Sequence, residues 1–407
     1  MPATPPLSVA VIALHTSPYA APGSGDVGGM NVLIRATAER MAAAGHRVEV
    51  VTRRYDRDQP ITEHLAPGLT LRYIDAGPPE PRPKADHEGF VDEFQAGLDA
   101  LGHVDLVHSQ HWLSGMAALP FARNRGVPHI QSFHSIAAHT STDLSHGERA
   151  ESPGRMPGEA WLAQNSDAIV AVSHAEQRTI LERLGAPIER VHVVLPGVDA
   201  SLFHPAEPTT RPRRYVVAAA RIEPLKGLDL AIRTIAEIDA GIRPDLLIAG
   251  GPTDGADHTL DELRALAVEL DVAERVHFIG PQSRDALAEL LSHASAALIP
   301  SHSETYGLVA LEAAASGIPV LATPTGGLSE AVTADSGILL DSRNPRDWAA
   351  QLAALLTDAP RLTRLSSSAR RYAETRSWSR STDETLAVYA SLLPRACDAR
   401  MPTPAPV

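Results

Sequence analysis

Four charged residues in the second half of the chain have the types and spacing to recognise a sugar joined to a diphosphate. Arg221 and Lys226 stand in the stretch ARIEPLKG, and Glu304 and Glu312 stand in SETYGLVALE. A charge-assisted hydrogen bond contributes about 1.5–3 kcal/mol, so two cations can clamp a diphosphate without a metal ion. The carboxylates can accept hydrogen bonds from sugar and ribose hydroxyls. Each residue alone could also be an ordinary exposed side chain beside a helix start.

The start of a helix is predicted between the two glutamates. The apolar spacing predicts a helix over 308–316, and the free amides at its start, near Gly307 and Leu308, favour an anion. Glu312 lies in this helix among Ala, Leu and Val residues. A carboxylate with such neighbours is costly unless it has a partner, which favours a binding role. A glutamate on the exposed surface of the helix is the alternative.

The first half contains a glycine-rich stretch, PGSGDVGGMN at residues 22–31, with the G-x-G-x-x-G spacing of dinucleotide-binding proteins. The residues HTSPYAAP separate it from the first predicted strand, which is too long a connection for the tight turn that a dinucleotide requires. Arg53 and Arg54 could accept the 2′-phosphate of NADP, so an NADP-dependent oxidoreductase stays an alternative. A glycine-rich loop that leads into a helix can also hold another anion on its backbone amides.

The histidines and the cysteine give weaker signals. His134 follows a predicted strand and has the residue type of a general base, although a histidine there can equally be a core residue that forms hydrogen bonds. His108 and His111 form the sequence HSQH, but no third metal ligand is evident, so we expect no metal. Cys397 is the single cysteine, which excludes an internal disulfide and a thiolate metal site.

Length, charge and hydropathy narrow the class of protein. A chain of 407 residues exceeds the roughly 250–300 residues of a single core, so we expect two domains. The net charge of -13 argues against nucleic acid or an anionic membrane as the main partner. The start MPATPP does not have the pattern of a signal peptide, and no run of about 18 uncharged apolar residues occurs. We therefore expect a cytoplasmic protein without stable membrane association.

Short apolar runs alternate with amphipathic ones, which is typical of βαβ units and parallel sheets. Strands are predicted in the first half at 8–14, 48–52, 69–74, 105–109, 128–133, 168–172 and 191–195, and in the second half at 214–220, 245–250, 275–280, 296–300, 319–323 and 336–341. Helices are predicted at 31–44, 259–270, 284–293 and 308–316. A proline-rich linker at 206–214 separates the two sets. Two doubly wound domains joined by a linker predict a binding cleft at the carboxyl ends of their strands.

Motifs in both halves resemble the retaining glycosyltransferases of family 4, and within them the actinobacterial D-inositol-3-phosphate glycosyltransferases of mycothiol synthesis. These motifs are HTSP, GDVGGMN, WLSG, SFHS, LPGVD, RIEPLKG, AGGP and the E-x7-E sequence ETYGLVALE. The resemblance implies an α/β protein of the GT-B fold, with two doubly wound, Rossmann-like domains facing across a cleft. It implies an acceptor-side domain over 1–200, a nucleotide-sugar-binding domain over 206–385, and a C-terminal helix and frayed tail over 386–407.

The resemblance also implies roles on the donor side. In similar enzymes the residues that match Arg221 and Lys226 hold the diphosphate, Glu304 contacts the transferred sugar, Glu312 binds the ribose hydroxyls, and His134 faces the donor sugar. The backbone amides that complete the phosphate site belong to Gly28, Gly29, Gly307 and Leu308. Retention in this fold is explained by attack on the same face, with the leaving phosphate taking the acceptor's proton. We therefore nominate no side-chain general base.

The acceptor side matches less closely. In the mycothiol enzymes an Asn, a Lys, a Tyr, a Thr and an Arg hold inositol phosphate. Asn31, Lys84 and Arg155 match three of these positions, while His111 replaces the tyrosine and Ser135 the threonine. The basic stretch of the family is replaced by AAHTSTD. A transferase of specialised metabolism, acting on a thiol or an antibiotic precursor, therefore stays an alternative.

The prediction is a hexosyltransferase that moves a sugar from a nucleotide sugar to a small polar acceptor, with D-inositol 3-phosphate as the specific acceptor. We expect a UDP-sugar before a GDP-sugar as donor, with the base read by backbone around 281–283. No further cofactor is expected, and the chain is expected to be a monomer or a homodimer. A nucleotide-sugar-binding module without catalysis is a third possibility, because fold and motif do not secure activity.

Overall fold

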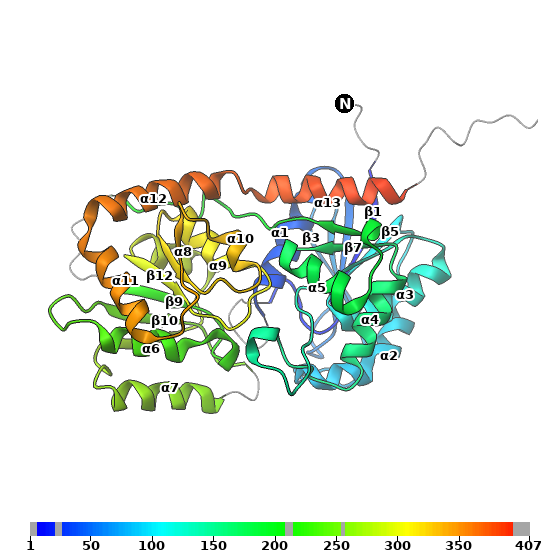
Figure 1. Cartoon of the computed structure of the whole chain (residues 1–407). Helices are drawn as coiled ribbons and strands as arrows, with labels where there is room; N and C mark the ends of the chain where they lie inside the picture. The colour runs from blue at the N-terminus through cyan, green and yellow to red at the C-terminus, as the bar shows by residue number, and fades with distance from the viewer. Residues whose placement is uncertain (1–5, 21–26, 208–214, 254–256, 394–407) are drawn as a thin grey trace, which may run out of the picture.

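Two parallel α/β sheets form the molecule (Figure 1). The computed structural model describes residues 6–20, 27–207, 215–253 and 257–393. One sheet has eight strands in the order β3-β4-β2-β1-β5-β6-β7-β8, and the other has six in the order β11-β10-β9-β12-β13-β14. The predicted fold class, two doubly wound α/β units, is confirmed.

The eight-stranded sheet is built from the first half of the chain. Its strands are β1 (Ser8–Ile12), β2 (Arg47–Arg53), β3 (Thr62–Ala66), β4 (Leu69–Ile74), β5 (Leu106–Gln110), β6 (His129–Ser132), β7 (Ala168–Ala171) and β8 (Val191–Val193). All described pairs are parallel except β3 with β4. The sequence analysis missed β3, because this edge strand, TEHLA, is polar and largely exposed and so lacks the apolar run of the buried strands.

Helices cover both faces of this sheet. They are α1 (Gly29–Ala43), α2 (Val91–Leu98), α3 (Trp112–Arg125), α4 (Arg155–Asn165) and α5 (His174–Leu184), with short 3-10 turns at Lys84–Phe90, Leu144–His146 and Ile188–Arg190. The predicted helix at 31–44 begins two residues earlier, at Gly29. It ends where Gly45 takes a φ of 96°, a conformation that glycine adopts without strain.

The second sheet follows the same plan. Its strands are β9 (Tyr215–Ala219), β10 (Asp245–Ala249), β11 (Val276–Gly280), β12 (Ala296–Ile299), β13 (Val320–Ala322) and β14 (Gly337–Leu339). The helices around it are α6 (Leu228–Glu237), α7 (Asp257–Glu269), α8 (Arg284–Ser292), α9 (Leu308–Ala315), α10 (Leu328–Ala331), α11 (Pro345–Thr357) and α12 (Ala359–Glu374), with a 3-10 turn at Pro224–Lys226. No helix within the described ranges combines the length and apolar character needed to cross a membrane.

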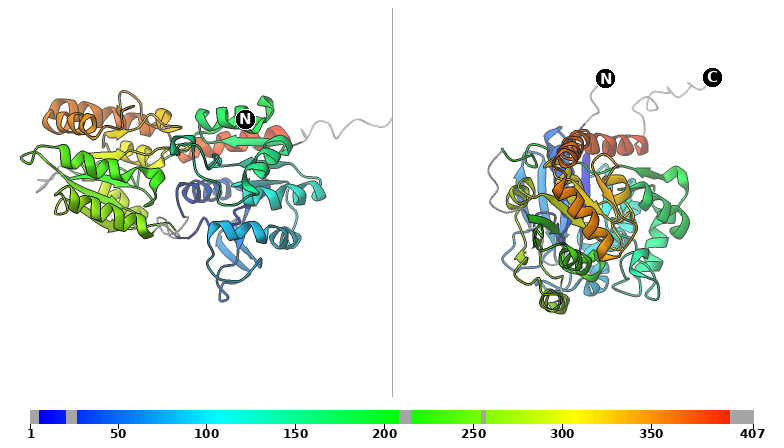
Figure 2. Two further views of the ribbon diagram at one scale, coloured as in Figure 1. Left: turned by 60° about the horizontal axis from the view of Figure 1, so that its bottom comes forward. Right: turned by 60° about the vertical axis from the view of Figure 1, so that its left-hand side comes forward.

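The last helix, α13 (Trp378–Leu392), returns to the first half and lies along α1 (Figures 1 and 2). Val388 and Tyr389 are buried in the core of the eight-stranded sheet. The chain returns to the first half at Ser377, which forms a β-bridge with Val198. α13 begins at the next residue, ahead of the expected C-terminal segment 386–407. The exact domain boundaries stay a prediction. Most of the expected linker 206–214, the tail from 394 onward and Cys397 lie outside the described residues.

Each sheet has one point at which the strand order reverses. In the first sheet β2 and β5 lie on opposite sides of β1, and in the second β10 and β12 lie on opposite sides of β9. The connections that follow two such strands diverge and leave a crevice at their carboxyl ends. His15 and His111 follow β1 and β5, while Arg221 and Glu304 follow β9 and β12.

Candidate active site

A cavity of about 340 Å³ is lined by residues from both halves of the chain. It lies at the two reversal points of strand order, because its walls include the segments that follow β1, β5, β9 and β12. Most of the predicted site residues line it: Gly28, Gly29, Lys84, His111, His134, Ser135, Arg221, Lys226, Glu304, Gly307, Leu308 and Glu312. Asn31 and Arg155 lie behind its wall.

Two helix N-termini from different halves meet at this cavity. Gly28 caps α1 and Gly307 caps α9. A Cβ atom on Gly29 would lie 3.2 Å from Cδ1 of Leu308, and one on Gly28 would lie 4.0 Å from Nε of Arg221. Glycine therefore keeps the α1 backbone open toward the cavity. The first amides of a helix have no partner in the helix itself, so the two helix starts give the site a positive potential that suits a phosphate group.

The predicted cations lie beside these helix starts and already have carboxylate partners. Nζ of Lys226 is 2.8 Å from Oε2 of Glu304, and Arg221 forms an ion pair at 3.0 Å with Glu223. The hydroxyl of Ser301 also donates to Glu304, at 3.3 Å. The side chains of the two ion pairs are between 14% and 24% exposed. They can therefore contact a ligand in the cavity while staying fixed by their neighbours.

Glu312 has one engaged oxygen and one open oxygen. Oε1 forms an ion pair at 2.7 Å with Arg284, the first residue of α8. Oε2 is buried and has no hydrogen-bond partner among the described residues. Burial raises the pKa of Glu312, although Arg284 opposes the rise. An unpaired oxygen on the cavity wall is costly unless a ligand hydroxyl donates to it, which matches the ribose contact predicted for this residue.

His134 is a partly buried, uncharged imidazole on the cavity wall. Its Nε2 lies 2.6 Å from the amide oxygen of Gln110, an acceptor, so Nε2 carries the proton and Nδ1 is an acceptor. Burial lowers the pKa of His134 to about 4. The residue has a φ of 61°, an uncommon value outside glycine that turns the chain sharply after β6. His134 is therefore placed to accept a hydrogen bond from a sugar hydroxyl.

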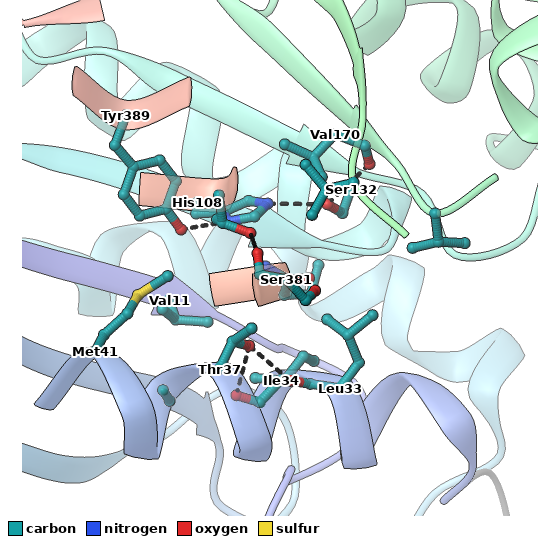
Figure 3. A pocket seen from close by; sticks show the side chains of 15 residues that line it. Val11, Leu33, Ile34, Thr37, Met41, His108, Ser132, Val170, Ser381 and Tyr389 are labelled. Carbon is teal, nitrogen blue, oxygen red and sulfur yellow. Dashed lines mark hydrogen bonds between the residues drawn. The ribbon is translucent and has the colours of Figure 1, made fainter. Parts of the chain in front are cut away.

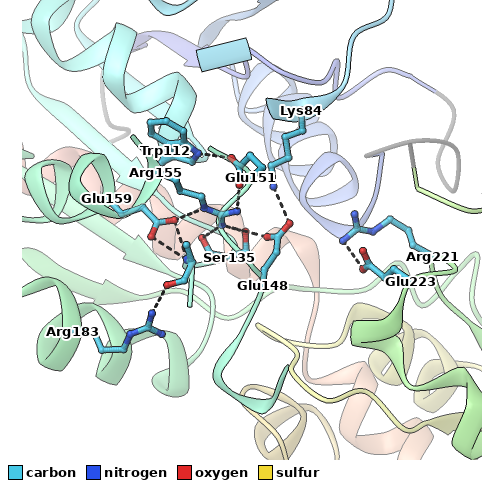
Figure 4. Close-up of polar contacts among 11 residues, drawn as sticks. Lys84, Trp112, Ser135, Glu148, Glu151, Arg155, Glu159, Arg183, Arg221 and Glu223 are labelled. Carbon is cyan, nitrogen blue, oxygen red and sulfur yellow. Dashed lines mark hydrogen bonds and ion pairs between the residues drawn. The ribbon is translucent and has the colours of Figure 1, made fainter. Parts of the chain in front are cut away.

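A charged network forms the wall on the side of the first domain (Figure 4). Nζ of Lys84 is 3.0 Å from Glu148, and Arg155 contacts the other oxygen of the same carboxylate at 3.3 Å. Ser135 accepts a hydrogen bond from Arg155 at 2.9 Å. Burial opposes ionisation of Glu148, yet Lys84 and Arg155 hold its pKa well below the ordinary value. Glu148 is therefore a carboxylate between two cations.

Two histidines lie against each other beside this network. The ring centroids of His15 and His111 are 4.4 Å apart. Neither nitrogen of His111, nor Nδ1 of His15, has a hydrogen-bond partner within the described part of the chain. Burial lowers the pKa of both rings well below the ordinary value, with Lys84 as the next cause. Both imidazoles are therefore neutral and have unused hydrogen-bonding capacity toward the cavity.

Asn31 supports the glycine loop from behind. Its Oδ1 accepts from the Gly28 amide at 3.1 Å, and its Nδ2 donates to Thr16 and to the carbonyl of Ser17. The side chain is 1% exposed, and its bond to the Gly28 amide is the N3 half of a capping box at the start of α1. In this structure Asn31 therefore fixes the backbone that lines the cavity and does not line the cavity itself.

His108 lies away from the cavity. Its Nδ1 is 2.6 Å from the hydroxyl of Tyr389 on α13, and its Nε2 is 2.9 Å from Ser132 (Figure 3). Nδ1 thus joins β5 to α13, and Nε2 joins β5 to the neighbouring strand β6. Within the ranges that the structure describes, no three histidine, cysteine or acidic side chains are grouped as possible metal ligands.

Family comparisons define the class of protein. Residues 28–197 match the model of the glycosyl transferase 4-like domain, and residues 202–372 match that of the glycosyl transferases group 1. The chain belongs to this family: it is a retaining glycosyltransferase of family 4 with the GT-B fold. It is similar to the D-inositol 3-phosphate glycosyltransferases of Thermobispora bispora, at 39% identity over 95% of each chain, and of Stackebrandtia nassauensis, at 37% identity over 96% of this chain and 93% of that one.

Solved structures agree with the fold. Sucrose-phosphate synthase from Thermosynechococcus elongatus has a TM-score of 0.86 at 25% identity, over 95% of this chain and 99% of that one. Anabaena HepE in complex with UDP and glucose has a TM-score of 0.74 at 18% identity, over 95% of this chain and all of that one.

The NADP-dependent oxidoreductase considered as an alternative is wrong. Family membership excludes it, and the guanidinium of Arg53, one of the arginines invoked for the 2′-phosphate, donates instead to the carbonyls of Arg54, Pro78 and Glu80. β1 ends at Ile12 and α1 begins at Gly29, so no tight turn joins them. Gly23 and Gly25 of the glycine spacing lie outside the described residues.

Among the cavity residues that were not predicted are His15, Arg284 and Glu148. His15 follows β1 directly, and its polarity at the carboxyl end of a buried strand is a readable signal. Arg284 begins α8 and could have been sought as the partner that a buried Glu312 requires. Glu148 gives no such signal, because it stands in a loop and meets Lys84 only through the tertiary fold. Its contact with Lys84 spans 64 residues of sequence.

Proposed function

We propose that the chain transfers a hexose from a nucleoside diphosphate sugar, most simply a UDP-sugar, to a small polar acceptor held by the first half of the chain. The observation that carries the proposal is one cavity with two helix N-termini and the cations Arg221 and Lys226 on its walls. Such an arrangement stabilises a diphosphate without a metal. The complex of HepE with UDP and glucose supports a UDP-sugar by analogy.

The reaction breaks the bond between the anomeric carbon and the diphosphate. Negative charge develops on the leaving group, where Arg221, Lys226 and the helix amides stabilise it, and positive charge develops on the sugar. The Lys226–Glu304 ion pair lets Glu304 face the sugar while it orients the lysine. His134 accepts a hydrogen bond from the sugar through Nδ1. The acceptor attacks the same face, and its proton passes to the leaving phosphate, so no side-chain base is needed.

The acceptor binds beside Lys84, His111 and Ser135. The names of the curated relatives make D-inositol 3-phosphate the first specific candidate. A thiol or an antibiotic precursor of specialised metabolism is the second, because His111 and Ser135 replace two of the expected acceptor residues. A cytoplasmic location and a monomeric or homodimeric state remain predictions.

Removal of the proposed diphosphate and sugar contacts tests this function. We expect Lys226→Ala and Glu304→Gln each to lower kcat/KM for the nucleotide sugar by about 10²–10³, the range for a lost transition-state contact. The measurement is the release of nucleoside diphosphate in the presence of a mixed pool of polyol and thiol acceptors, with products identified by mass spectrometry. Arg346→Ala is the control, because this arginine is 79% exposed and lies away from the cavity. Near-normal rates in both site variants, with unchanged circular dichroism, would remove the assignment.

A further inference from the structure

A network with more carboxylates than cations stands at the acceptor side of the cavity and behind its wall. Lys84 and Arg155 face the carboxylates of Glu148, Glu151 and Glu159 in one network (Figure 4). Counted with every group ionised, two positive and three negative charges give this group a formal net charge of -1. Burial raises the pKa of Glu159, although Arg155 opposes the rise. A ligand phosphate placed here would add negative charge where the carboxylates already outnumber Lys84 and Arg155.

Each side-chain nitrogen of Arg155 already has a partner in this network. Its Nε donates to Glu159 at 2.8 Å and its NH1 to Glu151 at 2.5 Å. Its NH2 donates to Ser135 at 2.9 Å and to Glu148 at 3.3 Å. The side chain is fully buried, at 0% exposure. A phosphate could bind Arg155 only by displacing a carboxylate, which would then be left buried beside a second anion.

Glu148 occupies the position that a ligand phosphate would need. It lies between Nζ of Lys84 and NH2 of Arg155, at 3.0 and 3.3 Å, and it lines the cavity. Those two cations are among the five residues that the mycothiol-type resemblance assigns to inositol phosphate. In this chain their charge is used by a carboxylate of the protein itself.

Two further side chains on this side of the cavity, His15 and His111, are uncharged. His15 and His111 lie against each other and have ring nitrogens without partners among the described residues. Both line the cavity, where His111 is buried and His15 is partly buried. They offer hydrogen bonds to a hydroxyl, amine or thiol, and Glu148 offers a carboxylate to a hydrogen-bond donor or a cation.

We infer that the acceptor carries no phosphate or other anionic group and is an uncharged or cationic polar molecule that donates hydrogen bonds to Glu148 and His111. The inference rests on the proposed sugar transfer and specifies its acceptor: it sets aside D-inositol 3-phosphate, the candidate taken from the names of the relatives, in favour of an acceptor without phosphate. It also separates this chain from the activity for which its curated relatives are named. Glu148 is thus a residue that determines acceptor specificity.

The test is the binding of a phosphate ester to enzyme saturated with UDP. UDP titrated first reports on the donor site, and a chain that does not bind UDP would contradict the proposed function by a separate measurement. D-inositol 3-phosphate is then titrated into the UDP complex by calorimetry. We expect Glu148→Gln to bind this ester at least about tenfold more tightly than the wild type, because the substitution frees Lys84 and removes a like charge.

The control removes the same charge elsewhere. Glu182→Gln lies on the exposed side of α5 and should leave the affinity for the ester at the wild-type value. Equal affinities in the wild type and Glu148→Gln, or turnover of D-inositol 3-phosphate by the wild type in preference to myo-inositol, would overturn the inference. The second result needs only the wild type, so it can contradict the inference even if Glu148→Gln folds poorly.

Discussion

The buried carboxyl of Glu176 stands behind the loop that carries His134. It belongs to the first turn of α5, is 5% exposed, and accepts a hydrogen bond from the Val172 amide at 2.7 Å. Burial raises the pKa of Glu176 to about 7. The folded protein therefore holds this proton more tightly than the unfolded chain does. Because the unfolded chain loses this proton at a lower pH, the free energy of unfolding falls as the pH rises from the ordinary carboxyl pKa to about 7.

We expect Glu176→Gln to remove this pH dependence. The raised pKa of Glu176 lowers the free energy of unfolding of the wild type by about 3 kcal/mol at most. This loss is complete above pH 7 and absent near pH 4. The stability of the variant relative to the wild type should therefore improve between pH 5 and pH 8, as measured by urea unfolding at both values. Glu182→Gln on the same helix should show no such change. A constant difference between variant and wild type at the two pH values would contradict the assignment.

A single site residue could be predicted where one short motif contains both the charged residue and the helix start beside it. Lys226 and Glu304 each follow a strand end, and parallel topology brings strand ends to one edge, so their 2.8 Å ion pair follows from a correct fold. The acceptor wall could not be predicted in this way. The Glu151–Arg155–Glu159 spacing is readable as one helix face, but it does not reveal that Glu148 joins Arg155 to Lys84.

At the scale of elements, the start of α9 depends on Gly307. This residue has a φ of 100°, and a Cβ atom there would lie 2.5 Å from Cδ2 of Leu328. We expect Gly307→Ala to cost about 1–2 kcal/mol for the left-handed backbone, with a further cost for the collision. The first amides of α9 would tilt away from the cavity, so KM for the nucleotide sugar should rise by about tenfold.

Gly45→Ala separates these two effects. Gly45 has a similar φ of 96° and lies at the far end of α1, and a Cβ atom there would meet no described atom within 4 Å. This control should lose stability through its backbone alone and keep the wild-type KM. Thermal unfolding and steady-state kinetics of the two variants make the comparison. Equal donor KM values in Gly307→Ala and Gly45→Ala would show that the start of α9 does not contact the donor.

At the scale of the whole molecule, the chain closes on itself through α13. The bond between His108 and Tyr389 joins residues 281 positions apart. The apolar pattern predicted every described strand except the exposed edge strand β3, because the burial of a strand is visible in its own residues. The return of α13 was not predictable from local pattern, since a helix face that covers the other half of the chain has the same periodicity as one that covers its own.

A second connection ties the halves together beside the donor cavity. Glu330 of α10 accepts hydrogen bonds from the amides of His174 and Ala175 at the start of α5, at 3.0 and 2.9 Å, and from the His174 ring at 2.8 Å. Ser173 donates to the carbonyl of Thr305 at 2.8 Å. Burial opposes ionisation of Glu330, but these hydrogen bonds hold its pKa below the ordinary value. The carboxylate form, and with it the connection, is present at neutral pH and is lost as the pH falls through that lowered pKa.

We expect Glu330→Gln to weaken the closed arrangement of the two halves. The glutamine keeps the shape but loses the charge that caps α5, at a cost of about 1 kcal/mol for a partly exposed group. KM for the nucleotide sugar should then rise by about fivefold, while kcat changes less, because the ligand must first restore the closed form. Small-angle scattering without ligand should show a larger radius of gyration than in Asp383→Asn, a control on the exposed side of α13. If the radius and KM both match that control, the Glu330 connection does not hold the halves together, and closure must depend on α13 alone.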